Sequence, residues 1–331
     1  MNTKPIIIPV AAGKGGVGKS FVTANLAIAL AEAGQRTIAV DMDLGSSNLY
    51  SFLGLPNRFP GIGDFLKARS AELEEILVST ETSNLQYLPG DGQTPFMANI
   101  PHGQKIRLIS HLVRLPADYI FLDLGAGTSF NTLDFFRLSA HGLLITIPEY
   151  PSIMSMLGFL KHLLLRIIEG HFTTNYRIRK VLHELYKQPL NGKQTIIKTL
   201  QSQISSIDSE AGEKVSSVFR EVRPRIIFNM GRHPDELKLS EQIDQSLKNF
   251  LSLETDYFGF LFDDPTVRES VKKGISYLPH YRDSSESKSI KRIAGRIVKY
   301  WDRPVKSSAQ HLLEHVRKAY EGHDHNQKEA T

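Results

Sequence analysis

The residues that point most directly to chemistry lie near the start of the sequence, between an apolar run at residues 5–12 and an alanine-rich helical pattern. They are Gly13, Lys14, Gly15, Gly16, Val17, Gly18, Lys19 and Ser20. They match the phosphate-loop pattern G-x-x-x-x-G-K-[ST], in the strand–loop–helix context that this pattern requires. Glycines let successive backbone N–H groups turn toward a phosphate, and the helix start adds unpaired donors and a positive dipole end. We therefore predict that Lys19 contacts nucleotide phosphates and that Ser20 contacts Mg²⁺, with Phe21 included in the nucleotide site.

Three carboxylates follow predicted strands. Asp41 and Asp43 end the strand at residues 37–40, and Asp123 ends the strand at residues 119–122. Ligands of open α/β sheets bind at the carboxyl ends of the strands. A carboxylate there suits phosphoryl transfer, whereas a lone Asp would more often cap the next turn. Three of them beside a phosphate loop favour a role in catalysis or Mg²⁺ binding.

Apolar strand-like runs alternate with helical patterns over most of the chain. The expected strands are residues 5–12, 37–40, 85–88, 119–122, 143–147, 225–229 and 257–262. This alternation is typical of an α/β fold with a mostly parallel sheet flanked by helices. A helix is expected at residues 68–78, between the second and third strands.

Composition limits the functional classes. The 331 residues include no cysteine, which excludes disulfides, thiolate chemistry and cysteine-held iron–sulfur clusters, and is consistent with a reducing cytosol. The sequence enters its first strand at once, and no run of 18 uncharged apolar residues occurs, so we expect neither a secretory signal nor a membrane-spanning helix. Residues 160–223 carry 11 Lys/Arg against 6 Asp/Glu, and residues 287–306 carry 7 against 1. These two basic segments are candidates for nucleic acid or acidic membrane.

Several motifs together resemble the MinD/ParA class of P-loop ATPases with a deviant Walker A motif, and most of all its MinD and FlhG branch. The signature lysine of K-G-G-x-G-K-[ST] is Lys14. Switch I is residues 41–49, Asp-Met-Asp-Leu-Gly-Ser-Ser-Asn-Leu, and switch II is residues 123–127, Asp-Leu-Gly-Ala-Gly. The Pro-Glu pair is 148–149, and the strand that ends in Asn-Met contains Asn229. The motifs occur in family order over residues 5–300.

The resemblance implies a P-loop NTPase fold, an Mg²⁺-dependent ATPase that cycles between ATP and ADP, and a role for each matching position. Lys19 and the loop bind the phosphates, while Lys14 reaches across a face-to-face homodimer to the partner's phosphates. Asp43 orients the attacking water at the metal site, Ser20 ligates Mg²⁺, and Asp123 holds the ion through a water. Asn229 reads adenine. Phe262 and Asp263 lie in the turn that closes over the base.

The implied activity is a dimerising ATPase switch that places a flagellar or division-site structure, working in the cytoplasm and at the inner face of the membrane with a protein activator or client. The absence of cysteine excludes the family's iron–sulfur members, and the switch sequences are closer to MinD and FlhG than to ParA. Two alternatives stay open. One is a ParA-like DNA-segregation ATPase. The other is a nucleotide-binding interaction module with little turnover.

Two segments depart from the family pattern or need interpretation. Relatives pass from the Pro-Glu strand to the Asn strand through one helix, whereas here a basic helical insertion is expected at about residues 160–223. We assign residues 1–302 to the ATPase domain and residues 303–331 to a C-terminal helix with a frayed tail. An apolar stripe from Ile290 to Trp301 is expected to pack on the sheet. The helix at residues 305–320 is either an anionic-membrane helix, as in MinD, or a packing helix.

Overall fold

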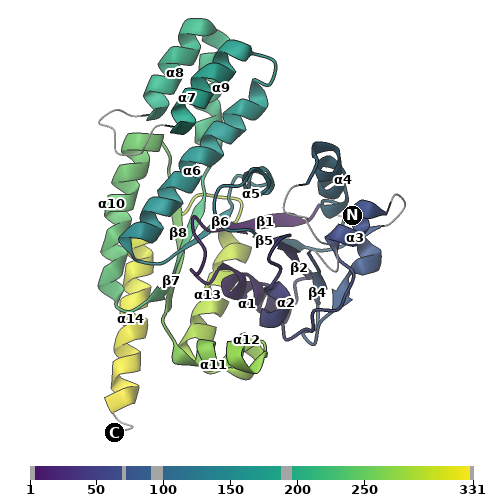
Figure 1. Ribbon diagram of the computed structural model, residues 1–331. Helices are drawn as coiled ribbons and strands as arrows, with labels where there is room; N and C mark the ends of the chain where they lie inside the picture. Colours follow the sequence, from purple (N-terminus) through teal and green to yellow (C-terminus); the bar gives the residue numbers. More distant parts are fainter. Residues whose placement is uncertain (1–3, 69–71, 91–99, 188–195, 329–331) are drawn as a thin grey trace.

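The computed structural model describes residues 4–68, 72–90, 100–187 and 196–328. Eight strands form one sheet in the order β3-β4-β2-β5-β1-β6-β7-β8 (Figure 1). The strands are β1 (Ile6–Ala11), β2 (Thr37–Met42), β3 (Val78–Ser79), β4 (Leu85–Leu88), β5 (Tyr119–Leu124), β6 (Leu143–Thr146), β7 (Arg225–Gly231) and β8 (Asp256–Phe262). All neighbouring strands pair in parallel except β3, which runs antiparallel to β4. The expected α/β class with a mostly parallel sheet is confirmed.

Helices cover both faces of the sheet, because its central strands are apolar on both sides. On one face lie α1 (Lys19–Glu32), α2 (Leu49–Phe52), α12 (Tyr277–His280) and α13 (Ser285–Tyr300). On the other lie α3 (Ile62–Lys67), α4 (His102–Leu112), α5 (Phe130–Phe136), α6 (Tyr150–His171), α10 (Leu239–Ser246) and α14 (Ser308–Lys328). Helix α11 (Pro265–Lys273) follows β8. The two apolar layers hold the strands rigidly and leave the carboxyl ends for a site.

The pairing register of the strands places two of the predicted carboxylates side by side in the sheet. Asp41 of β2 is paired with Asp123 of β5, and Asp123 is in turn paired with Val10 of β1, just before the phosphate loop. The three strands are adjacent in the sheet. Residues more than 100 positions apart therefore meet at one edge.

The prediction of a helix at residues 68–78 is wrong for the residues that the structure describes. Residues 69–71 lie outside the described part. A 3-10 turn spans Leu73–Ile76, and the edge strand β3 follows. Val78 pairs with Tyr87 of β4. Pairing with the open edge of β4 supplies backbone hydrogen bonds that a short isolated helix would lack, and β-branched Val78 suits a strand.

Between β6 and β7 the chain forms a helical bundle that stands off one end of the sheet (Figure 1). It comprises the far half of α6, with α7 (Tyr176–Lys187), α8 (Ile196–Ile207) and α9 (Ser209–Glu221). No strand occurs in the described residues between β6 and β7. Helix α6 is long and apolar enough to cross a membrane by length and composition, but 61% of its most apolar 18-residue window is buried within the protein. That burial is the environment of a core helix.

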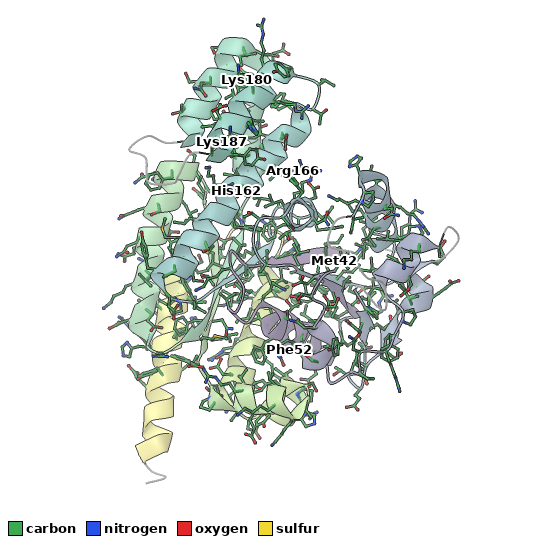
Figure 2. All side chains as sticks on the ribbon, in the orientation of Figure 1. Met42, Phe52, His162, Arg166, Lys180 and Lys187 are labelled. Atoms are coloured by element: carbon green, nitrogen blue, oxygen red, sulfur yellow. The ribbon has the colours of Figure 1, made fainter. Side chains whose placement is uncertain are left out.

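Asp134 ties the bundle to the sheet. This α5 residue is 3% exposed and accepts hydrogen bonds from Arg166 of α6 and from Lys105 of α4. Burial alone would raise the pKa of Asp134, but these two cations hold it below its usual value. Arg166 also lies over the ring of Phe130, at the start of α5. Figure 2 shows Arg166 on the side of the bundle that faces α5.

The C-terminal helices pack on opposite faces of the sheet near β8. The apolar stripe of α13 is buried from Ile290 to Trp301, as expected, apart from Val298, which is 47% exposed. Helix α14 begins three residues later than predicted and seats Leu312 and Val316 against the other face. Of the two interpretations of this helix, the structure thus shows the second, a helix whose apolar face packs on the sheet. The helix extends through residue 328, where a frayed tail was expected, and residues 329–331 lie outside the described part.

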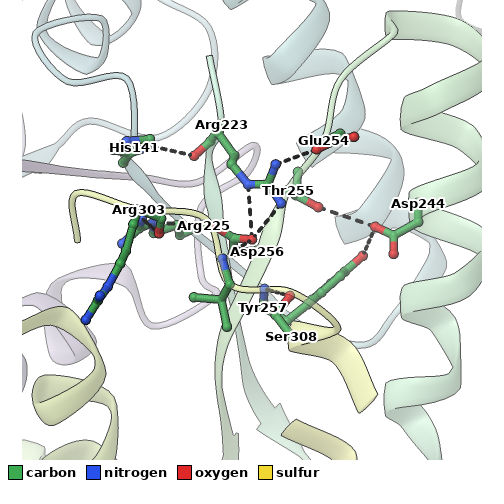
Figure 3. Close-up of polar contacts among 11 residues, drawn as sticks. His141, Arg223, Arg225, Asp244, Glu254, Thr255, Asp256, Tyr257, Arg303 and Ser308 are labelled. Atoms are coloured by element: carbon green, nitrogen blue, oxygen red, sulfur yellow. Dashed lines mark hydrogen bonds and ion pairs between the residues drawn. The ribbon is translucent and has the colours of Figure 1, made fainter. Parts of the chain in front are cut away.

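A buried polar cluster fixes the turn between α13 and α14 (Figure 3). Asp256, at the start of β8, accepts from Arg223 at 3.0–3.1 Å and from the backbone N–H of Val305. The Ser308 hydroxyl accepts the N–H of Tyr257 at 3.0 Å. These bonds hold α14 against the sheet at its first turn.

Candidate nucleotide site

The phosphate loop joins β1 to α1 and has the backbone that its glycines permit. Gly16 and Gly18 have φ angles of +82° and +80°, in the left-handed region that other residues rarely adopt. A Cβ on Gly13 would lie 2.3 Å from the backbone of Ser155 in α6. No side chain caps the start of α1, so its first N–H groups face the loop without a side-chain acceptor. The loop is thus shaped to receive an anion.

A cavity of about 560 Å³ opens beside this loop. Its lining includes the following predicted site residues: Lys14, Gly15, Gly16, Val17, Gly18, Lys19, Ser20, Phe21, Asp43, Asn229, Phe262 and Asp263. Gly13 and Asp123 do not line it. Gly13 packs under the loop against α6, and Asp123 lies behind Lys19, wholly buried.

Lys19 and Asp123 form a buried ion pair, with Nζ 2.8 Å from Oδ1. The same Oδ1 accepts the hydroxyl of Thr23 at 2.9 Å, while the buried Oδ2 has no partner among the described residues. Lys19 Nζ also lies 3.4 Å from the Ser20 hydroxyl, so Ser20 and Asp123 contact the same ammonium group. Carboxylate and hydroxyl oxygens are the kind of ligand that Mg²⁺ prefers. The residues present therefore fit the expected ion.

Asp41 is wholly buried one strand away, and it accepts the N–H groups of Leu49 and Asp43. Burial, and then the charge of Asp123, raise its pKa to about 7. Asp41 does not line the cavity; it holds switch I in place, and Asp43 is the switch I carboxylate that lines it. A Cβ on Gly125 would lie 3.3 Å from Asp43 Oδ1, so switch II passes close to this carboxylate.

Lys14 lies at the mouth of the cavity. Its side chain is 34% exposed, and its Nζ is 3.9 Å from Oε2 of Glu149, the glutamate of the predicted Pro-Glu pair. At this distance and exposure the pair is weak. Lys14 is therefore held beside the phosphate loop but can still reach outward.

Asn229, in β7, lines the cavity and contacts the phosphate loop. Its side chain is buried, and its Nδ2 donates to the carbonyl of Val17 at 2.9 Å. This bond leaves the side-chain oxygen of Asn229 as an acceptor at the cavity. Phe262 and Asp263 line the same cavity.

Sequence reasoning did not assign the following further lining residues to the site: Asn48, Phe52, Ala126, Met230, Val267, Arg268, Val271, Lys272 and Glu286. Asp264 also lines the cavity, and it belongs to the turn at residues 262–265 that was expected to close over the base. Asn48 and Ala126 lie within the switch motifs, so their neighbourhood was visible from the sequence. Arg268, Lys272 and Glu286 are brought in by the packing of α11 and α13, which only the fold reveals.

Comparison with known proteins agrees with this architecture. Residues 8–277 match the CobQ/CobB/MinD/ParA nucleotide binding domain family. The chain is 32% identical to the antiactivator FleN of Pseudomonas aeruginosa, over 88% of this chain and 85% of that protein. It is 30% identical to the flagellum site-determining protein YlxH of Helicobacter pylori, over 74% of this chain and 80% of that protein.

A third relative matches over a shorter length. The septum site-determining protein MinD of Helicobacter pylori is 34% identical over 45% of this chain, and the match spans 55% of that protein. Among solved structures, MinD of Pyrococcus horikoshii complexed with Mg-ADP has the same fold, with a TM-score of 0.56 and 20% identity over 89% of this chain and 96% of that one. The chain belongs to the CobQ/CobB/MinD/ParA nucleotide-binding family, in its MinD/FlhG-type branch.

Proposed function

We propose that this chain is a Mg²⁺-ATP-dependent ATPase that dimerises in its ATP state and positions a flagellar or division-site structure. The observation that carries the proposal is the place of Lys14. It lies beside a phosphate loop, lines the cavity, and is tied only loosely to Glu149. A lysine in this position is free to approach the nucleotide of a second copy.

In this mechanism the loop amides and Lys19 hold the phosphates, and binding of the phosphates competes with Asp123 for Lys19. Bound Mg²⁺ would neutralise developing phosphate charge, held by Ser20 and, through a water, by Asp123. Asp43 orients the attacking water and accepts its proton. Lys14 of the other copy adds positive charge where the transferring phosphoryl group becomes negative, as an arginine finger does.

ATP acts as a switch because only its terminal phosphate offers Lys14 a contact across the dimer. A ligand shifts a two-state equilibrium by its difference in affinity for the two states. With ADP that contact is lost and the dimer separates. Switch II contacts α5 through the Thr132 hydroxyl, which donates to the carbonyl of Gly125. Asp134 and Phe130 of α5 in turn contact Arg166 of α6. A movement of switch II would therefore reach the helical bundle through α5 and Arg166.

We place the protein in the cytoplasm and at the inner face of the membrane, with a protein activator or client as partner. The relatives that support this are named an antiactivator, a flagellum site-determining protein and septum site-determining proteins. Binding to anionic lipid through α14 would require Leu312 and Val316 to leave the sheet. Pelleting with anionic vesicles that is lost on removal of residues 305–331 tests this route.

One feature favours a DNA-binding role as the second candidate. The exposed face of α7 carries Arg177, Arg179, Lys180 and Lys187, and none of them has an ion pair within the described chain. Lys180 and Lys187 lie on the bundle, away from the sheet (Figure 2). ATP-dependent DNA retention that falls steeply with salt would support a ParA-like role.

The proposed function is tested by phosphate release from ATP at increasing protein concentration. Because a complete site requires two copies, activity per molecule should rise with concentration in the wild type. It should stay low and flat in Lys14→Ala and be unchanged in the matched control Lys306→Ala, which alters an exposed lysine that does not line the cavity. Activity per molecule that is independent of concentration in the wild type would refute the dimer mechanism.

A further inference from the structure

The side chain of Phe262 takes part both in the nucleotide cavity and in the packing of helix α14. Phe262 ends β8, is half-buried, and lines the cavity. Its ring centroid is 5.7 Å from that of Tyr320 in α14, and the two ring planes are tilted by 36°. Tyr320 itself is not among the described residues that line the cavity. One wall of the cavity is therefore in contact with the C-terminal helix.

Further contacts fix the part of α14 that carries Tyr320. The ring of His233, which follows β7, meets Tyr320 nearly edge-on, with the centroids 5.1 Å apart. On the same helix, Arg317 donates to Oδ1 of Asp235 at 3.0 Å, and this hydrogen bond holds the pKa of Asp235 below its usual value. Because Arg317 and Asp235 are both exposed, their pair adds little to the stability of the contact. The aromatic rings thus do most to place Tyr320.

The backbone at Phe262 is held without help from α14. The next residue, Asp263, donates its N–H to the carbonyl of Gly231 at 2.8 Å. Glu286, buried in the first turn of α13, accepts the N–H of Phe262, and burial raises the pKa of this carboxyl to about 8. These bonds fix the path of the chain. They leave the direction of the Phe262 ring to side-chain packing, in which Tyr320 takes part.

We propose that Tyr320 is a positioning residue for the nucleotide site: α14, docked on the sheet, holds the Phe262 ring in the wall of the cavity and thereby raises the affinity for nucleotide. The inference rests on the proposed binding of nucleotide in this cavity. Without Tyr320, one side of the Phe262 ring would face water, and the ring could adopt other rotamers. Nucleotide binding would then have to order the ring as well, and that cost lowers the affinity.

The coupling between the helix and the site acts in both directions. If docked α14 raises the affinity for nucleotide, bound nucleotide stabilises the docked helix by the same factor. Bound nucleotide should therefore oppose the release of Leu312 and Val316 from the sheet, which lipid binding through α14 requires. Within one copy of the chain, nucleotide binding and release of this helix would compete.

Titration calorimetry with Mg-ADP on the full chain measures the first direction. ADP is chosen because, in the proposed mechanism, it does not drive the pairing of two copies. Tyr320→Ala should bind Mg-ADP about three- to tenfold more weakly than the wild type, as expected for the loss of one aromatic pair. Tyr320→Phe keeps the ring and should bind Mg-ADP as the wild type does.

Tyr300→Ala is the matched control. Tyr300 is a partly buried tyrosine of α13 whose ring contacts Lys299 and Arg303, neither of which lines the cavity. This variant should bind Mg-ADP with wild-type affinity. Melting curves establish that each variant is folded, and Tyr320→Phe separates the effect of the ring from that of a general disturbance of α14.

Hydrogen exchange of the backbone amides at residues 309–321 measures the reverse direction. Saturating Mg-ADP should slow this exchange by about three- to tenfold in the wild type and by less in Tyr320→Ala. Wild-type affinity in Tyr320→Ala, or exchange in α14 that Mg-ADP does not slow, would overturn the inference and leave the proposed function intact. If the wild type does not bind Mg-ADP at all, the proposed function fails and the inference fails with it.

Discussion

The backbone of Gly18 passes so close to Asn229 that a Cβ on Gly18 would lie 2.2 Å from Asn229 Nδ2. The same amide group donates to the carbonyl of Val17. The loop predicted to hold the phosphates and the side chain predicted to read the base are therefore one packed unit. Replacing Gly18 should disturb both ends of the site at once.

Gly18→Ala should lower nucleotide affinity by at least about tenfold, because the new methyl displaces Asn229 and the φ of +80° costs about 1–2 kcal/mol for alanine. Titration calorimetry with Mg-ADP measures the loss. Gly295→Ala is the control: nothing lies within 4 Å of the added Cβ in α13, and the helix should gain about 0.5–1 kcal/mol. Unchanged affinity in Gly18→Ala would contradict the assignment of the loop.

Asp43→Ala should slow ATP hydrolysis by about a hundredfold or more, because the attacking water loses its orienting base. Nucleotide binding should persist, so the variant should accumulate as the ATP-bound dimer. Phosphate release and light scattering with ATP measure the two effects, with Asp283→Ala, an exposed carboxylate, as the control. Wild-type turnover in Asp43→Ala would instead favour an interaction module that hardly uses hydrolysis.

Asp134→Ala should lower the free energy of unfolding by about 3–5 kcal/mol, because it leaves buried Lys105 without its partner and removes a partner of Arg166. Urea denaturation measures the change. Glu269→Ala removes an exposed partner of Lys273 and should have little effect. A loss below about 1 kcal/mol for Asp134→Ala would mean that the bundle is not anchored through this carboxylate.

The raised pKa of Glu286 also predicts a pH-dependent difference in stability. The unfolded side chain loses its proton near its ordinary pKa of 4.5, whereas the folded one has a pKa of about 8. Between these values the folded state binds more protons, so stability falls as pH rises, by up to about 1.4 kcal/mol per pH unit. Glu286→Gln lacks this loss and should melt progressively higher than the wild type from pH 5 to pH 8. A constant difference in melting temperature would contradict the shift.

The sheet and the phosphate loop could be predicted from sequence because their signals are local. A buried parallel strand is a short apolar run, and Gly13 to Ser20 carry their geometry in their own residue types. The edge strand at Val78 could not be predicted in this way. Its conformation depends on the open edge of β4, which is a tertiary partner.

The base end of the cavity was predicted only where a motif marks it, at Asn229 and the turn after β8. Arg268, Lys272 and Glu286 enter it through the packing of α11 and α13. The environment of helix α14, which contains Leu312, could likewise not be predicted from the sequence. An amphipathic pattern states that one face is apolar, and it does not state whether a membrane or the sheet covers that face. In this structure the sheet does.

In the proposed mechanism, Lys14 couples the terminal phosphate of ATP to the pairing of two copies. Size-exclusion chromatography with light scattering, with ADP and then with a non-hydrolysable ATP analogue, tests this directly. The wild type should be a monomer with ADP and a dimer with the analogue, whereas Lys14→Ala should bind the analogue and stay monomeric. A wild-type mass that does not change between the two nucleotides, or an analogue-dependent Lys14→Ala dimer, would contradict it.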